Sequence, residues 1–173
     1  MKSRSIYTGR VIELNLEQVT LPNGHNFELE VVSHPGGAAV VALNNQGQVC
    51  LLHQYRHVTG GWLWELPAGK LAGGTPLDNA QRELAEESGV SAKDWAPLGI
   101  YWSSPGIFKE VVHLFLARQL TQDVATPEPD EVIRVSWVPL DEACQWAIDG
   151  KIVDGKTVVG LWRAQAAVAR QVT

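Results

Sequence analysis

The stretch that decides the fold of this chain is Arg82-Glu83-Leu84-Ala85-Glu86-Glu87-Ser88-Gly89-Val90. It places three carboxylates and one guanidinium within six residues, and a glycine follows them after one serine. On an α-helix, these three glutamates fall on one face, within a sector of roughly 100°. Acids so close together repel one another, unless they point into water or a cation lies among them. The pattern therefore predicts either a solvated helix face or a cation site.

The ends of this helix follow from the residues around it. Thr75 is a good N-cap, Pro76 suits the first helical position, and Asp78 stands three residues after the cap. Gly89 is a typical residue just past a helix C-terminus. These signals predict a helix from Pro76 to Ser88.

A glycine-rich loop precedes the helix. An apolar run leads into it, and the whole segment reads Trp64-Glu65-Leu66-Pro67-Ala68-Gly69-Lys70-Leu71-Ala72-Gly73-Gly74-Thr75-Pro76. Glycines let a backbone approach a ligand closely, and exposed carbonyls bind hard cations. The loop therefore favours the cation site over the solvated face.

Loop and helix together resemble the Nudix box. That family motif is a Gly, five residues, a Glu, seven residues, and then Arg-Glu-apolar-x-Glu-Glu-x-Gly-apolar. Its second half matches at every fixed position from Arg82 to Val90. The first half differs, because Gly74 stands where the family has Glu, and Gly69 lies thirteen rather than fourteen positions before Arg82. The loop is thus one residue short and lacks one acid.

The resemblance extends beyond the box, to about residues 5–165, and it is closest to the ADP-ribose pyrophosphatase branch of the family. The order and spacing of several short motifs carry it. They are His34-Pro35-Gly36-Gly37-Ala38, Gln54-Tyr55-Arg56, Glu65-Leu66-Pro67-Ala68-Gly69, Ser104-Pro105-Gly106, Glu110 and His113-Leu114-Phe115-Leu116.

Hydrophobic and turn patterns predict an α/β fold. The expected strands are 6–16, 27–32, 38–43, 49–54, 62–66, 96–103, 110–116 and 133–138, with further helices at 140–148 and 156–170. Asn44-Asn45-Gln46-Gly47 is a hairpin signal. We expect a Nudix-type α/β/α sandwich with a mixed sheet, divided into an N-terminal antiparallel β segment, 1–34, and a Nudix hydrolase domain, 35–173. The resemblance also implies a homodimer, with the N-terminal sheet packed or exchanged across the two-fold axis.

Composition sets limits on the function. With 173 residues, 45% of them hydrophobic and 19% charged, the chain has the size and composition of one folded domain. A net charge of −5 gives no general attraction to nucleic acid or to an anionic membrane. Cys50 and Cys144 lack metal-ligand spacing, and no apolar leader or membrane-length run occurs. We therefore expect a cytoplasmic protein with reduced thiols.

The resemblance implies metal-dependent chemistry. By position in the motif, Glu83, Glu86 and Glu87 are the expected metal ligands, together with the carbonyl of Ala68. Oxygen ligands suit Mg²⁺ or Mn²⁺, which would activate water and neutralise phosphate charge. Arg82 is expected to pair with a ligand glutamate and fix its orientation.

Two further residues are candidates for substrate binding. Arg56 ends the Gln54-Tyr55-Arg56 motif and is either a phosphate clamp or one half of a salt bridge at a strand end. Glu65 either binds substrate or pairs with Arg56.

A general base is expected from a late acidic loop that holds Glu128, Asp130 and Glu131. Glu131 is the first choice because it lies two residues before the strand at 133–138. Glu110 is the second, since it matches an acidic family position near the metals. A charged loop that simply stays in water is the alternative interpretation.

The function expected from the resemblance is hydrolysis of the diphosphate of a nucleoside diphosphate sugar. ADP-ribose, giving AMP and ribose 5-phosphate, is the first choice of substrate. One alternative is a GDP-mannose or other nucleotide-sugar pyrophosphatase, which Gly74 favours because an altered loop indicates altered metal use. Another is a Nudix-fold binding or sensing module that no longer turns over substrate.

Overall fold

The computed structural model describes residues 3–129 and 131–170. Strands and helices follow one another along the chain, with three α-helices in the described part. Their bounds are β1 Ser3–Thr8, β2 Glu13–Thr20, β3 Asn26–Ser33, β4 Gly37–Ala42, β5 Gln48–Arg56, β6 Gly61–Glu65, β7 Ala68–Lys70, α1 Pro76–Ser88, β8 Val90–Ser104, β9 Phe108–Gln122, β10 Ile133–Pro139, α2 Leu140–Ile148 and α3 Gly155–Ala169.

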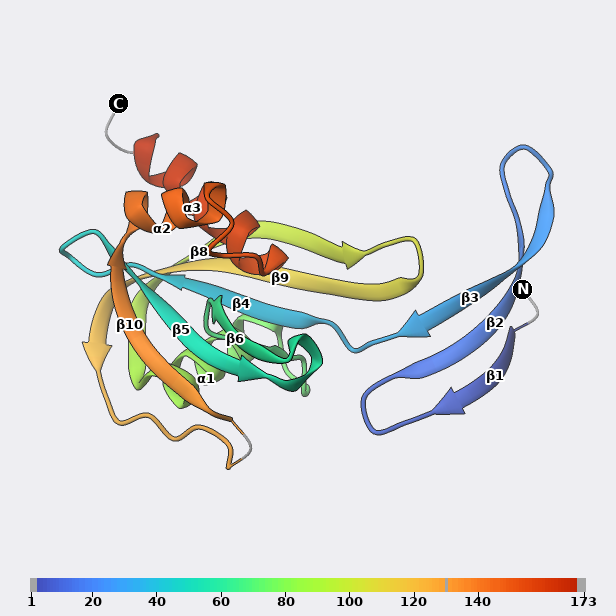
Figure 1. Cartoon of the computed structure of the whole chain (residues 1–173), viewed down its shortest axis with the longest axis horizontal. Helices are drawn as coiled ribbons and strands as arrows, with labels where there is room; N and C mark the ends of the chain where they lie inside the picture. Colours follow the sequence, from blue (N-terminus) through green and yellow to red (C-terminus); the bar gives the residue numbers. More distant parts are fainter. Residues whose placement is uncertain (1–2, 130, 171–173) are drawn as a thin grey trace.

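The strands form two sheets. The larger has the order β1-β2-β3-β9-β4-β7, with β8 also paired to β9, and the smaller has the order β10-β5-β6. Strand β9 runs parallel to β3 and β4, whereas the other pairs are antiparallel. The sheets are flanked by α2 and α3 on one side and by α1 on the other (Figure 1). The mixed α/β architecture expected from the sequence is confirmed.

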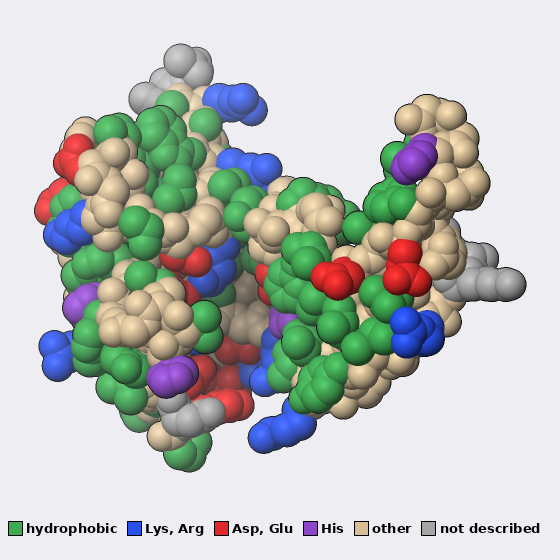
Figure 2. Space-filling model, turned by 45° about the vertical axis from the view of Figure 1, so that its right-hand side comes forward, with side chains coloured by type: hydrophobic (Ala, Val, Ile, Leu, Met, Phe, Trp, Pro, Cys, Tyr) green, Lys and Arg blue, Asp and Glu red, His purple; other side chains and the backbone are tan. Residues whose placement is uncertain are grey.

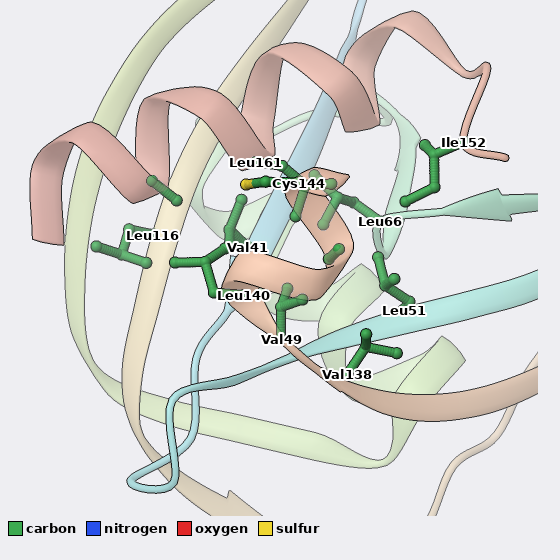
Figure 3. Packing of buried hydrophobic residues seen from close by; sticks show 12 residues of the cluster. Val41, Val49, Leu51, Leu66, Leu116, Val138, Leu140, Cys144, Ile152 and Leu161 are labelled. Atoms are coloured by element: carbon green, nitrogen blue, oxygen red, sulfur yellow. The ribbon is translucent and has the colours of Figure 1, made fainter. Parts of the chain in front are cut away.

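Strand β4 shows how the layers are held together. Successive side chains of a strand point to opposite faces, and Val40 and Val41 belong to different clusters of buried residues. Val41 packs with Leu161 of α3 and Leu140 of α2 (Figure 3), whereas Val40 packs with Leu84 of α1. A strand covered on both faces is apolar throughout, and all six residues of β4 are buried.

Three local expectations are corrected. The strand expected at 6–16 is two strands, because the chain turns between them and the Gly9 N–H donates to the Ile12 carbonyl at 2.9 Å. The turn at 44–47 is present, with Asn44 N–H bonded to the Gln48 carbonyl at 3.0 Å, but β4 and β5 then diverge into different sheets. Part of the expected loop is the short strand β7, which pairs with β4.

The N-terminal strands β1, β2 and β3 form one end of the larger sheet and extend away from the rest of the molecule (Figure 1). They connect to the other strands where Val32 and Ser33 of β3 pair with Phe108 and Lys109 of β9. Every residue of β1 is exposed. Large apolar side chains are left in water on these strands and their turns, namely Ile6, Tyr7, Val11, Ile12 and Leu21.

Within the described ranges, no helix has the length and apolar character needed to span a bilayer.

Candidate active site

A cavity of about 600 Å³ lies at the edge of the larger sheet, next to α1. Figure 2 shows acidic and basic side chains facing one another across a hollow in the middle of the view. The cavity wall includes most of the residues expected from the sequence, namely Arg56, Ala68, Arg82, Glu83, Glu86, Glu110 and Glu131. These residues come from segments far apart in the chain, and the fold brings them together around one cavity.

Helix α1 begins and ends where the sequence predicts. The Thr75 side chain accepts a hydrogen bond from the Asp78 N–H at 3.1 Å, and the Asp78 carboxylate accepts one from the Thr75 N–H at 2.8 Å. At the other end, Gly89 has a φ of 65°, the left-handed conformation that glycine adopts most easily. These caps fix where the helix begins and ends, and hence where the acids of its second half lie.

Two of the three helix acids turn towards the glycine-rich loop. Glu83 and Glu87 are 7% and 2% exposed, and the Glu87 carboxylate accepts a hydrogen bond from the Ala68 N–H at 2.8 Å. The Glu83 carboxylate lies against Gly69, where any side chain would collide with it. Glu86 is more open, with 34% of its side chain exposed. The acidic face is thus directed into the cavity wall and not into bulk water.

The buried acids lie in surroundings that disfavour their ionised forms. Burial raises the pKa of Glu87 to about 8, against the hydrogen bond from Ala68, and the charges of Glu131 and Glu83 raise it further. Burial also raises the pKa of Glu83, although Arg82 opposes the shift. A site of this kind favours either protons or metal cations.

Arg82 pairs with two of the helix acids. Its Nη2 lies 2.6 Å from Glu83 Oε1, and its Nη1 lies 2.7 Å from Glu86 Oε2. The pairing expected for Arg82 is therefore present. The guanidinium holds both carboxylates in fixed orientations beside the cavity.

Arg56 and Glu65 form a two-point ion pair. The two hydrogen bonds are Nε to Oε1 at 2.7 Å and Nη2 to Oε2 at 3.0 Å. Glu65 is 2% exposed, and burial alone would raise its pKa. The bonds from Arg56 and the charge of Lys156 outweigh burial and lower the pKa to about 2. Glu65 thus pairs with Arg56, whereas Arg56 both forms this salt bridge and lines the cavity.

The two candidate bases lie in different parts of the cavity. Glu131 is near enough to Glu83 and Glu87 for its charge to raise the pKa of both. Its carboxylate accepts a hydrogen bond from the Glu128 N–H at 2.9 Å. Glu110 instead lies 3.2 Å from Nδ1 of His34. Asp130, the other acid of the late loop, lies outside the described residues.

Several cavity residues were not singled out from the sequence. Lys70, Gly37, Val112 and Tyr101 form a row across four strands, because each is opposite the next in the sheet register. Lys70 has no carboxylate partner in the described part of the chain, unlike Arg56 and Arg82. Its place directly after Gly69 was a signal that could have identified it. Ser103, whose Oγ is buried without a hydrogen-bond partner in the described structure, also lines this cavity.

No three His, Cys, Asp or Glu side chains of residues 3–129 and 131–170 are arranged as they stand to hold a metal ion. The three glutamates of α1 have other partners instead. Arg82 forms ion pairs with Glu83 and Glu86, and Glu87 accepts a hydrogen bond from the Ala68 N–H. The three carboxylates nevertheless offer only oxygen ligands, and those of Glu83 and Glu87 are buried. Their negative charges repel one another, and such a set of ligands fits a hard divalent cation.

The chain is similar to known proteins along most of its length. A model of the NUDIX domain matches residues 33–158. A "Methanol dehydrogenase activator" of Bacillus methanolicus is 37% identical over 164 residues, covering 93% of this chain and 89% of that protein. An "ADP-ribose pyrophosphatase" of Bacillus subtilis is 36% identical over 169 residues, covering 96% and 91%. A crystal structure of an "ADP compounds hydrolase" superposes with a TM-score of 0.84 over 99% of this chain and 94% of that one, at 18% identity, a likeness of fold alone.

Proposed function

Because this chain is a pyrophosphohydrolase of the Nudix family, we propose that it hydrolyses the diphosphate of a nucleoside diphosphate sugar. The proposed substrate is ADP-ribose, and the products are AMP and ribose 5-phosphate. One observation carries the proposal: the acidic face of α1 and the guanidinium of Arg56 line the same cavity of about 600 Å³. Hydrolysis of a diphosphate needs both. The Arg56 guanidinium would donate hydrogen bonds to the phosphate oxygens, and the acids would hold the metal ion that activates water. The name of the Bacillus subtilis relative supports the choice of substrate.

The proposed metal ligands are Glu83, Glu86, Glu87 and the carbonyl of Ala68. An oxygen donor set suits Mg²⁺, with Mn²⁺ as an alternative. When bound, such an ion neutralises phosphate charge and lowers the pKa of a coordinated water. The mutual repulsion of Glu83, Glu87 and Glu131 supports a cation here, because a nearby positive charge favours ionised carboxylates.

The residues of this chain would act on water and phosphate as follows. Glu131, the proposed general base, accepts a proton as the water oxygen bonds to phosphorus, and the bond from phosphorus to the bridging oxygen breaks. The second phosphate leaves with that oxygen. Arg56 donates hydrogen bonds to the diphosphate, while Arg82 holds Glu83 and Glu86 in position. Glu110 is the alternative base.

The test is a substrate panel with the purified protein and a divalent metal salt. ADP-ribose should give AMP and ribose 5-phosphate in equal amounts, at a higher kcat/KM than GDP-mannose. A higher value for GDP-mannose would select the alternative that Gly74 favours. Tight binding of nucleotide sugars with no hydrolysis over hours would select the binding or sensing module. Replacing Glu131 by Gln should lower kcat more than replacing Glu110 by Gln does, and the reverse order would exchange their roles.

We also propose that the protein is a homodimer built on the N-terminal β segment. The strands β1 and β2 extend from the body of the protein with apolar side chains exposed, an arrangement that is poorly stable in water. A second copy of the chain, packed on β1 and β2, would cover the exposed Ile6 and Tyr7.

A further inference from the structure

Four charged side chains form a cluster beside the cavity: Arg56, Glu65, Asp154 and Lys156. All four line a second hollow, of about 620 Å³, and Arg56, Asp154 and Lys156 line both hollows. The four charges sum to zero. The cluster is therefore a neutral group of connected ion pairs, and a change in one pair affects the others.

Two cations share one buried carboxylate at its centre. Glu65, which is 2% exposed, accepts both hydrogen bonds of Arg56. It also accepts one from Lys156, with Nζ 2.5 Å from Oε2. A buried carboxylate requires one cation to remain ionised, and Glu65 has two. Glu65 therefore keeps a cation beside it when Arg56 turns donors to another anion, because Lys156 contacts both Glu65 and Asp154.

Exposure separates the two cations. The Arg56 side chain is 39% exposed, whereas that of Lys156 is 18% exposed. Arg56 is the cation that an incoming diphosphate can reach more easily. Lys156 is the cation that stays behind with Glu65.

Lys156 is held in place independently of Arg56. Its Nζ lies 3.1 Å from Asp154 Oδ1, and Asp154 caps α3 by accepting a hydrogen bond from the Thr157 N–H at 3.1 Å. The Thr157 hydroxyl oxygen in turn accepts a bond at 2.9 Å from the N–H of Leu66, the residue after Glu65. The start of α3 is thus fixed to the end of β6. Lys156 does not need Arg56 to keep its position.

We propose that Lys156 is a positioning residue for Arg56. By keeping Glu65 paired, Lys156 allows the Arg56 guanidinium to turn its donors to the substrate diphosphate without leaving a buried charge alone. This inference rests on the proposed function. Without Lys156, Glu65 would depend entirely on Arg56, and the substrate would have to compete with that pair.

The test is the variant Lys156→Met. We expect KM for the nucleotide sugar to rise about tenfold or more, the size of one lost charge-assisted contact, while kcat stays within about threefold. Lys156→Arg, which keeps the charge, should restore most of the affinity. Lys93→Met, at an exposed lysine of β8 outside the cavity wall, is the matched control and should leave both constants unchanged.

A second substitution distinguishes positioning from a purely structural role. In the double variant Glu65→Gln with Lys156→Met, no buried carboxylate remains to hold Arg56, so KM should return to within about threefold of wild type. A loss of stability alone would not be rescued in this way. If Lys156→Met does not fold, the double variant carries the test by itself. A KM unchanged in Lys156→Met, or still raised about tenfold in the double variant, would overturn the inference. Absence of hydrolysis by the wild type would instead refute the proposed function.

Discussion

The Glu87 carboxylate accepts a hydrogen bond from the backbone N–H of Ala68 at 2.8 Å, which joins the second half of α1 to the glycine-rich loop. This contact links two neighbouring segments of the proposed active site. Glu87 is 2% exposed, so the bond is protected from water. The position of the loop relative to the helix acids therefore depends on this one side chain more directly than on Glu86, which is partly exposed.

Replacing Glu87 by Gln should lower kcat by about a hundredfold or more and leave the fold intact. The amide oxygen can still accept from the Ala68 N–H, but the negative charge offered to a cation is lost. Steady-state kinetics and circular dichroism check this. Glu142→Gln, at an exposed acid of α2, is the control. Near-normal turnover in Glu87→Gln would remove this residue from the metal site.

Replacing Gly69 by Ala should reduce activity sharply. A methyl group at this position would collide with the Glu83 carboxylate, so either the loop or the acid has to move. Overpacking of this kind destabilises a protein by about 1–3 kcal/mol. Gly106→Ala is the matched control, because nothing lies near a methyl group there. Equal kinetic constants and equal melting temperatures for Gly69→Ala and Gly106→Ala would show that neither activity nor stability depends on the present position of the Glu83 carboxylate.

The metal-free protein should lose stability as the pH rises. The pKa of Glu87 is raised by burial from 4.5 to about 8, so the folded state binds this proton more tightly than the unfolded state. The stabilisation is complete below about pH 4.5 and is lost as the pH approaches 8. Thermal unfolding in a chelator should show a melting temperature that falls more steeply across this window than in Glu87→Gln. Parallel curves for the two proteins would contradict the shift.

Replacing Lys70 by Ala should weaken substrate binding. Lys70 lines the cavity and, within the described residues, has no carboxylate to neutralise it, so its ammonium is free for an anion. We expect KM to rise by about five- to tenfold with little change in kcat, and the salt dependence of KM to become weaker. Lys93→Ala serves as the control. If both variants bind equally well, Lys70 is only a surface charge.

Deleting residues 1–33 should convert the proposed dimer into a less active monomer. A single substitution in the full-length chain tests the same surface while keeping the N-terminal strands in place. Tyr7 is 58% exposed on β1, and Tyr7→Asp places a charge where a second copy would pack. Light scattering measures the mass of each. Ile148→Asp, at a side chain 59% exposed on α2, is the control. A dimer that survives both N-terminal changes would show that the contact surface lies elsewhere.

Local sequence signals predicted the fold where local interactions decide it. Helix α1 begins at Pro76 and ends at Ser88 as expected, because its capping box and C-terminal glycine lie within a few residues of the bonds they make. The turn at 44–47 was likewise recognised. The strands on either side of it were located correctly in the chain, but their pairing was not, since β4 and β5 part into two sheets. Pairing with β9 and β10, far along the chain, decides that separation.

The sequence by itself determined the helix, its acids, the loop before it and the family to which they belong. Spacing along a helix fixes which side chains share a face, and no distant segment is needed for that. Only the tertiary structure decided which charges meet. Lys156 reaches Glu65 across 91 positions of sequence, and no local pattern marks the pair. Burial makes that contact important for stability, because a carboxylate removed from water stays ionised only beside cations. The fold decides which cations those are.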